Sequence, residues 1–284
     1  MPRLLEAAER DEFRAAILEN YRLRGRSFPW RETEDPYAIL VSEIMLQQTQ
    51  TERVVPKYAA WLARFPTAEA LAASPLPDAF ALWNGLGYNR RARFLWEACK
   101  TVAADYGGVF PRDADALDAL PGIGAYTARA VSTFAFGKPE VFIETNIRSV
   151  FLFHFFSGQP PGSVHDREIL PLVEQTLERG EPRVWYYALM DYGAQLKKAV
   201  RNPNRASAHY AKQSRFTGSL RQARGAILRA LSANAEGGAY QPLSLRAISE
   251  RESVGYERIK QAAAALAAER IIEQDGDACA IASG

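Results

Sequence analysis

The feature that most constrains the fold of this chain is a Pro-Gly-x-Gly turn at residues 121–124, between two short segments of helical periodicity. Pro121 ends the first helix because proline donates no backbone N–H, and Gly122 and Gly124 allow dihedral angles closed to other residues. The second helix is expected to bury residues at helical spacing: Ala128, Val131 and Phe134. A Gly-x-Gly turn at a helix N-terminus presents unpaired N–H groups and a positive dipole end, which suits a phosphate. Taken alone, the turn favours a plain helical hairpin.

Composition narrows the class of protein. The 284 residues are 48% hydrophobic, enough for one large domain or two ordinary ones, and no apolar run is as long as a membrane span. The N-terminus lacks a signal-peptide pattern, so we expect a cytoplasmic protein, associated with the nucleoid in a bacterium. Cys99 and Cys279 lack metal-ligand spacing, and Cys99 is expected to be a small buried hydrophobe. Because the net charge is only +2, a nucleic-acid role depends on where the charges lie.

Several separated motifs accompany the turn, which continues as Tyr126-Thr127-Ala128. They are Pro29-Trp30-Arg31, Asp35-Pro36-Tyr37, Ser42–Gln50, Leu82–Tyr88 and Met190–Ala194. In this order they resemble the MutY-like adenine DNA glycosylases of the helix-hairpin-helix (HhH-GPD) DNA glycosylase superfamily, over roughly residues 10–196. The resemblance implies a monofunctional DNA glycosylase, which hydrolyses the N-glycosidic bond of a mispaired or damaged base.

The expected helix from Pro36 to about Gln48 carries the first candidate site residues. Glu43 lies among apolar neighbours, and burial favours the protonated form that a general acid needs. By resemblance Glu43 is the catalytic acid, and Gln47, Gln48 and Thr49 are minor-groove contacts that probe the base opposite the lesion. The alternative interpretation is a solvated or salt-bridged glutamate followed by an ordinary polar helix terminus.

A second DNA contact is expected at the glycine-flanked segment Leu86-Gly87-Tyr88. Glycines on both sides of Leu86 suggest an exposed turn, and an exposed apolar wedge beside an aromatic ring suits entry into a base stack. Arg90 and Arg91 follow at once and can neutralise phosphates. A capped helix end whose tyrosine packs locally is the competing interpretation.

The loop after the hairpin carries the remaining catalytic candidates. By resemblance Tyr126 occupies the position of the lysine that forms a Schiff base in bifunctional relatives, so we expect no efficient AP-lyase activity. Glu144 follows a strand-like run, Val141–Ile143, and faces the N-terminus of a helix, which stabilises negative charge. The family usually has aspartate there, and one methylene moves a carboxylate by on the order of 1 Å. Either the pocket compensates or the substrate differs. Asn146 matches the family and is expected to fix the loop.

Residues 197–229 contain nine basic residues and no acid. The basic residues are Lys197, Lys198, Arg201, Arg205, Lys212, Arg215, Arg221, Arg224 and Arg229. A solvated linker is the bland interpretation, but beside a glycosylase-like core we expect phosphate contacts, with Arg201 and Arg205 among them. Many relatives hold an iron–sulfur cluster here on four cysteines. This chain has none of them, so no cluster is expected, and Tyr192, Tyr210 and Phe216 are expected to pack in its place. The turn Leu120–Gly124 is a candidate site for a monovalent cation.

The tail is expected to be separate. Three helices, at 223–231, 243–249 and 256–270, precede a hairpin at 271–281 that turns at Asp275-Gly276. We therefore predict a mainly α protein, with a two-lobed helical glycosylase core over residues 1–217 and a small winged-helix-like α+β domain over residues 218–284. Winged helices bind DNA or protein, and the fold does not decide which.

The predicted substrate is adenine opposite guanine or 8-oxoguanine, in double-stranded DNA bound by a monomer. Thymine or uracil opposite guanine, and hypoxanthine, are the alternative substrates. A non-catalytic DNA-binding protein is the third interpretation. MutY-type enzymes normally end in a domain that resembles a nucleotide hydrolase and helps to recognise 8-oxoguanine. Nothing in this tail resembles that domain, so any preference for 8-oxoguanine is expected to be modest.

Overall fold

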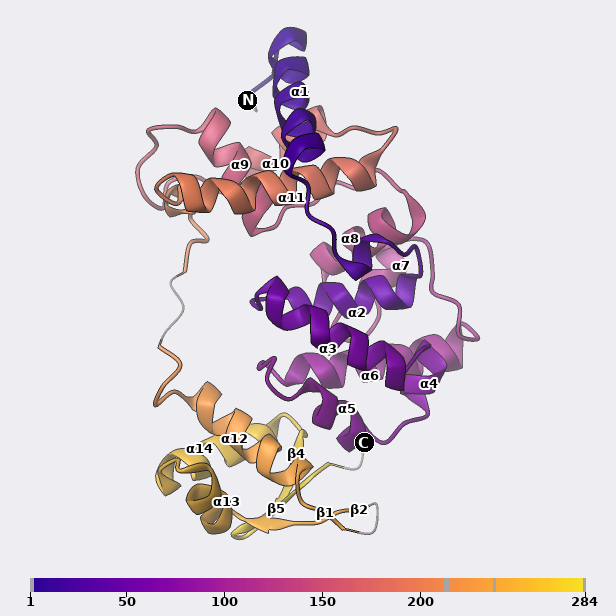
Figure 1. The fold of residues 1–284 in the computed structure, drawn as a ribbon, viewed down its shortest axis with the longest axis vertical. Helices are drawn as coiled ribbons and strands as arrows, with labels where there is room; N and C mark the ends of the chain where they lie inside the picture. The colour runs from indigo at the N-terminus through magenta and orange to yellow at the C-terminus, as the bar shows by residue number, and fades with distance from the viewer. Residues whose placement is uncertain (1–2, 212–214, 237–238, 283–284) are drawn as a thin grey trace. The chain divides into compact units, whose positions relative to one another are not determined.

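A computed structural model describes residues 3–211, 215–236 and 239–282, so Lys212 of the basic segment lies outside the described residues. The chain is mainly helical, as predicted (Figure 1). Its contacts divide it into two compact units, which we describe separately. Unit 1 comprises Met1–Ile39, Arg112–Asp118 and Gly124–Lys212, and unit 2 comprises Leu40–Pro111, Ala119–Ile123 and Gln213–Gly284. In the described part of the chain, no helix is both long and apolar enough to cross a membrane.

Unit 1 is built around two helices that cross closely. Its helices are α1 (Ala7–Arg24), α7 (Ala114–Asp118), α8 (Ala125–Phe136), α9 (Thr145–Phe155), α10 (Asp166–Thr176) and α11 (Pro182–Ala199), with 3-10 turns at Pro29–Arg31 and Pro203–Ala206. α11 packs against both α9 and α1. At the α9 crossing stands Gly193, where an added Cβ would lie 2.2 Å from the carbonyl oxygen of Asn146. The absence of a side chain at Gly193 is therefore what lets α9 approach.

Residues 141–143 were predicted to be strand-like, and this prediction is wrong. They form an irregular loop before α9. Phe142 is buried there, with its ring stacked 3.9 Å from that of Tyr186, whose hydroxyl accepts a hydrogen bond from the Phe142 N–H. The apolar run therefore reflects packing against α11 rather than membership of a sheet.

A buried ion-pair cluster ties the segment after α1 to α11. The Asp191 side chain is fully buried and accepts hydrogen bonds from both Arg26 and Arg31 at 2.7–2.9 Å. Burial alone would raise the pKa of Asp191, but the hydrogen bonds and charges of these arginines outweigh burial and hold that pKa below its usual value.

Unit 2 contains the middle helices and the C-terminal segment. Its helices α3 to α6 are Thr51–Arg64, Ala68–Ala72, Leu76–Trp83 and Arg90–Asp105, and α2 (Pro36–Leu46) enters this unit at Leu40. Trp61 and Trp83 meet edge to face at 5.5 Å in the core. Cys99 is fully buried, as predicted for a small hydrophobe.

The C-terminal segment has the predicted winged-helix-like fold. Its helices α12 (Leu220–Ser232), α13 (Leu245–Glu252) and α14 (Tyr256–Ala268) accompany strands β3 (Leu243–Ser244), β4 (Ile272–Asp275) and β5 (Ala278–Ile281). The strands form an antiparallel sheet in the order β3-β5-β4, and β4 and β5 form the predicted hairpin. The predicted helix start at residue 243 is wrong, because Leu243 and Ser244 pair with β5. A small hairpin of β1 (Ala235–Glu236) and β2 (Ala239–Tyr240) was not predicted.

The C-terminal helices contact the rest of unit 2 directly. α12 packs against α5, and the Tyr240 hydroxyl donates a hydrogen bond to Asp78 in α5. The division of the chain at residues 217 and 218 stays a prediction.

Candidate functional site

Glu43 is buried, as the apolar sequence around it predicts. Glu43 is 7% exposed, and its neighbours Val41 and Ile44 are at most 3% exposed. α2 is buried along nearly its whole length, so the carboxyl group of Glu43 lies in the protein interior. A carboxylic acid held out of water in this way can serve as a general acid.

Glu144 occupies the helix N-terminus predicted for it, where it is the N-cap of α9. Its Oε1 atom accepts hydrogen bonds from the backbone N–H of Asn146 at 2.7 Å and of Ile147 at 2.8 Å. Oε2 lies 3.3 Å from the side-chain amide of Asn146. One carboxylate oxygen thus satisfies the open end of the helix, and the orientation of the whole group is fixed.

Lys197 of α11 completes this cluster, and we did not predict this position for it. Its Nζ donates a 2.8 Å hydrogen bond to Oδ1 of Asn146, so Asn146 connects the amine to the Glu144 carboxylate. Burial lowers the pKa of Lys197, and the negative charge of Glu144 acts in the opposite direction. Asn146 was expected to fix the loop, and its contacts agree with that expectation.

Tyr126 lies in the first turn of α8 and borders a cavity of about 430 Å³ in unit 1. Its ring meets Phe142 edge to face at 5.7 Å. Arg129 and Arg167 also line the cavity. The four catalytic candidates therefore fall into two sets. Tyr126, Glu144 and Asn146 belong to unit 1, and Glu43 belongs to unit 2.

The two loops predicted to probe DNA contain strained residues at their tips. Gln48, after α2, has a φ of 55°, and Tyr88, before α6, has a φ of 48°. Only four non-glycine residues in the described ranges have a positive φ, and these are two of them. Left-handed dihedral angles at bulky residues cost free energy and concentrate at functional sites.

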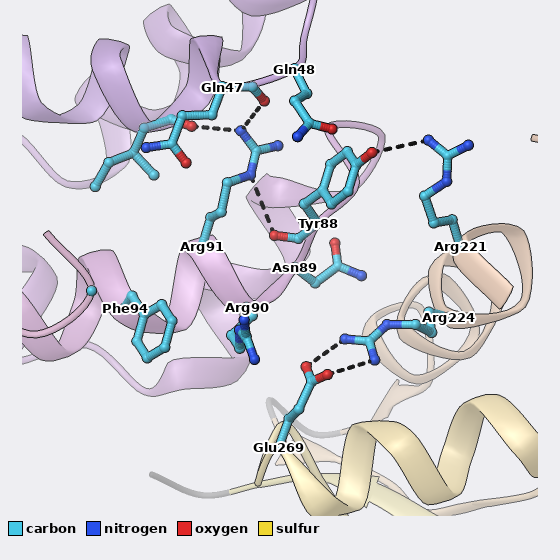
Figure 2. A pocket seen from close by; sticks show the side chains of 12 residues that line it. Gln47, Gln48, Tyr88, Asn89, Arg90, Arg91, Phe94, Arg221, Arg224 and Glu269 are labelled. Carbon is cyan, nitrogen blue, oxygen red and sulfur yellow. Dashed lines mark hydrogen bonds and ion pairs between the residues drawn. The ribbon is translucent and has the colours of Figure 1, made fainter. Parts of the chain in front are cut away.

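One half-buried arginine, Arg91, holds both loops (Figure 2). The Arg91 guanidinium donates hydrogen bonds to the carbonyl oxygens of Ile44 (2.6 Å), Gln47 (2.7 Å), Gly87 (3.1 Å), Met45 (3.2 Å) and Leu86 (3.3 Å), and to the Thr49 hydroxyl (3.4 Å). Burial lowers the pKa of Arg91 to about 10, so the group is charged at neutral pH. Arg91 is thus directed at the protein's own carbonyl groups, and its predicted contact with phosphate stays a prediction.

The exposure predicted for Leu86 is wrong. Leu86 is only 4% exposed, whereas Tyr88 is 36% exposed. Two hydrogen bonds to Trp83 close the turn with Leu86 pointing inward. The indole N–H of Trp83 donates to the Gly87 carbonyl oxygen at 3.1 Å, and the Leu86 N–H donates to the Trp83 carbonyl oxygen. The apolar group offered at the tip of this turn is therefore the tyrosine ring.

A cavity of about 460 Å³ in unit 2 gathers many of the predicted DNA-binding residues. Among those that line it are Gln47, Gln48, Tyr88, Arg90, Arg91 and Gly122. Gly122, at the hairpin turn, has a φ of 69°, and a Cβ there would lie 2.3 Å from Phe94, so no other residue fits. Gly124 lies outside the cavity as the N-cap of α8.

This cavity is also lined by three residues of the C-terminal segment, Arg221, Arg224 and Glu269 (Figure 2). Arg224 and Glu269 form a bidentate ion pair at 2.9 and 2.6 Å. The sequence showed Arg221 and Arg224 only as members of a basic run. No local pattern could place them beside residues more than a hundred positions earlier.

Polar contacts, rather than the predicted aromatic packing, anchor residues 201–207. Asn204 is buried, and its side-chain amide donates to the Thr145 carbonyl at 3.0 Å and to the Ser149 hydroxyl at 2.5 Å. Tyr210 is 44% exposed and Phe216 is 57% exposed, so the expected packing of these two rings is wrong. Tyr192 is half-buried and lies 3.2 Å from Nε2 of His154. Arg201 and Arg205 are exposed beside this anchor, and their DNA contacts stay predictions.

The family follows from comparison with known proteins. A family model described as HhH-GPD superfamily base excision DNA repair protein matches residues 41–183, half of the chain. The chain belongs to this family. In the described residues no group of acidic, histidine and cysteine side chains could hold a metal ion. Neither cysteine forms part of a cluster.

Similar proteins include two named adenine DNA glycosylase. That of Mycolicibacterium smegmatis is 47% identical over 135 residues, 47% of this chain and 46% of its own length. That of Homo sapiens is 35% identical over 199 residues, 66% of this chain and 36% of its own. The chain thus spans less than half of either relative. The solved structure of a thermostable thymine-DNA glycosylase is 32% identical, with a TM-score of 0.61, over 69% of this chain and 90% of that one.

Proposed function

We propose that this protein is a monofunctional DNA glycosylase that hydrolyses the N-glycosidic bond of adenine mispaired with guanine or 8-oxoguanine. The observation that carries the proposal is the buried carboxyl group of Glu43, in a chain 35–47% identical to proteins named adenine DNA glycosylase. Adenine leaves deoxyribose poorly until it is protonated, and a buried carboxylic acid can supply that proton.

The remaining roles follow from the chemistry of bond cleavage. As the base departs, the sugar becomes cationic, and Glu144 supplies a fixed negative charge to stabilise it. Water then completes the hydrolysis. Tyr126 offers no amine, so we propose base removal without efficient strand cleavage. DNA with a mismatch or lesion is the proposed partner, and the monovalent cation at Leu120–Gly124 remains part of the proposal.

Thymine opposite guanine is the second candidate substrate. It is favoured by the 32% identity to a protein named thymine-DNA glycosylase, over 90% of that chain. The chain therefore covers a far larger share of that protein than of either relative named adenine DNA glycosylase.

Single-turnover excision on a panel of duplexes tests the proposal. The panel holds adenine opposite guanine, adenine opposite 8-oxoguanine, thymine opposite guanine, uracil opposite guanine, and hypoxanthine. We expect the two adenine duplexes to react fastest, with a modest preference between them. Faster excision of thymine would favour the second candidate, and no excision of any base would favour a non-catalytic DNA-binding protein.

The variant Glu43→Gln identifies the acid in the same assay. It keeps the shape of the side chain but cannot act as a carboxylic acid, so excision should fall by at least ~100-fold while duplex binding is retained. A nearly normal rate would remove Glu43 from the mechanism.

A further inference from the structure

The C-terminal segment contacts the loop predicted to probe DNA through Arg221. Arg221, in the first turn of α12, donates a 3.1 Å hydrogen bond from Nη1 to the hydroxyl oxygen of Tyr88. Its guanidinium carbon lies 5.8 Å from the centre of the Tyr88 ring, and that of Arg91 lies 5.5 Å from the same centre. Two cations, one from α6 and one from α12, therefore contact the same aromatic ring (Figure 2).

The surrounding cavity has the charge expected of a phosphate site. Its described lining includes four guanidinium groups, from Arg90, Arg91, Arg221 and Arg224, and one carboxylate, from Glu269. That carboxylate is already paired with Arg224. The net positive charge of this lining, next to the backbone of the hairpin turn, suits a phosphodiester better than an apolar or cationic ligand.

We propose that α12 is part of the DNA-binding surface, that the cavity receives the backbone of the strand opposite the excised base, and that Arg221 holds Tyr88 toward that strand. The inference rests on the proposed function, because it requires lesion-containing DNA as ligand. The strand follows from Gln47 and Gln48, two of the residues expected to probe the opposite base, which line the cavity together with Tyr88. Arg221 is thus a positioning residue for Tyr88.

The holding contact has an energetic reason. Tyr88 keeps a left-handed backbone, which relaxes unless its surroundings enforce it. Arg91 fixes the backbone side of the residue, since its Nε lies 3.4 Å from the Tyr88 carbonyl oxygen. Arg221 fixes the far end of the ring. A ring held at both ends loses less conformational entropy when it enters a base stack.

The test uses the full chain and a duplex that needs no choice of substrate base. The duplex carries a stable abasic-site analogue, with the fluorescent base 2-aminopurine opposite it. Binding is measured over a salt series, and the rise in fluorescence reports how far the opposite base is unstacked. Wild type is compared with Arg221→Ala and with a control, Arg258→Ala. The control removes an equal charge from an exposed residue of α14 that does not line the cavity.

For Arg221→Ala we expect about tenfold weaker binding, a salt slope lower by about one unit, and a smaller fluorescence rise. Arg258→Ala should match wild type in all three. Tyr88→Phe keeps the ring but loses the hydroxyl, so it should reduce the fluorescence rise and leave the salt slope unchanged. The double variant that combines Arg221→Ala with Tyr88→Phe should give a fluorescence rise at least as large as that of Arg221→Ala alone. Arg221→Lys keeps a donor and should restore part of the signal.

Two outcomes distinguish failure of this inference from failure of the proposed function. If wild type binds and unstacks the opposite base while Arg221→Ala behaves like Arg258→Ala, the role of α12 is overturned and the proposed function stands. If wild type neither binds the abasic duplex nor excises a base, the proposed function falls and the inference falls with it. Thermal unfolding of each variant confirms that it is folded, and the isosteric Tyr88→Phe variant carries the test should Arg221→Ala not fold.

Discussion

At the scale of single residues, the two candidate catalytic glutamates, one in each unit, have contrasting surroundings. Glu43 lies among apolar side chains, whereas one oxygen of Glu144 accepts two backbone N–H groups. The proposed mechanism gives these two carboxyl groups different roles, Glu43 as the general acid and Glu144 as the anion. The assignment of roles can therefore be tested separately for each.

For Glu144 we predict that the charge matters more than the reach. Glu144→Gln keeps an oxygen to cap α9 but loses the negative charge, so excision should fall by at least ~100-fold with little change in thermal stability. Glu144→Asp should not raise the rate, because the cap contacts fit the longer side chain. Single-turnover rates measure both. A markedly faster aspartate variant would show that the pocket is built for the shorter residue.

For Lys197 we predict an effect transmitted through Asn146. Lys197→Met keeps the apolar stem but removes the donor to Oδ1 of Asn146, leaving that oxygen without its charged partner. Excision should slow by about tenfold, the scale of one hydrogen bond from a charged group. Lys197→Arg should recover part of the rate. An unchanged rate in the methionine variant would show that Asn146 is held without Lys197.

These two residues show what a sequence can and cannot predict about this site. The burial of Glu43 was predictable because its apolar neighbours lie within three positions along one helix. The contact between Lys197 and Asn146 joins residues 51 positions apart and depends on how α9 crosses α11. Leu86 was placed wrongly because flanking glycines indicate a turn, but they do not say which way its side chain points.

At the scale of elements, the crossing of α9 and α11 depends on Gly193. Gly193→Ala would bring a methyl group within 2.2 Å of the carbonyl oxygen of Asn146, the residue whose backbone N–H donates to Glu144. We expect a loss of about 1–3 kcal/mol in unfolding free energy. The excision rate of the folded variant should also fall. Denaturant unfolding and single-turnover kinetics measure the two effects.

Gly225 in α12 provides the matched control for this prediction. A Cβ there would lie 3.4 Å from the Arg229 side chain, an ordinary contact. Gly225→Ala should therefore stabilise the helix by up to about 1 kcal/mol. Equal effects of the two substitutions would mean that the crossing has room for a methyl group.

The Asp191 cluster predicts a defined pH dependence of stability. Asp191→Asn leaves two arginines without their buried carboxylate and should cost about 3–5 kcal/mol at pH 7. Because the folded pKa of Asp191 lies below its unfolded value of about 3.9, its contribution is complete above that pH. The contribution is lost as pH falls toward the folded pKa. Urea unfolding at pH 7, 5, 4 and 3 should show the gap between wild type and variant narrowing only at the lowest values. A constant gap would contradict the assignment.

Sequence signals predicted elements better where chain geometry is local. Pro121, Gly122 and Gly124 placed the hairpin turn, and the Asp275-Gly276 turn placed the C-terminal hairpin. β3 escaped prediction because two residues carry no periodicity, and only pairing with β5 makes them a strand. The anchoring of residues 201–207 by Asn204 likewise depends on α9, which lies far away in the sequence.

At the scale of the whole molecule, DNA binding must come from the distribution of charge. Arg201 and Arg205 are exposed beside the Asn204 anchor, so their backbone is fixed while their side chains face solvent. Reversing both to glutamate should weaken binding to all duplexes alike and lower the salt slope by roughly one unit for each lost phosphate contact. Binding titrations at several salt concentrations measure this slope.

Reversing Arg251 and Arg258, which are exposed on α13 and α14, provides the control with the same change in net charge. If both double variants change the slope equally, only the net charge matters. The assignment of residues 201–205 to the DNA interface would then be withdrawn.

The position of Arg91 has a consequence for how this protein can vary. Gln48 and Tyr88 sit on separate loops, yet both loops depend on one guanidinium, so a single codon change would disable two contacts at once. Lysine could not substitute, because one ammonium group cannot span carbonyls that five planar N–H donors reach. A substitution at Gln48 or at Tyr88 affects one loop and can be compensated within that loop. Loss of Arg91 affects both loops and cannot be compensated by one further substitution. Sampled across natural variants, position 91 should therefore change least among the residues that line this cavity.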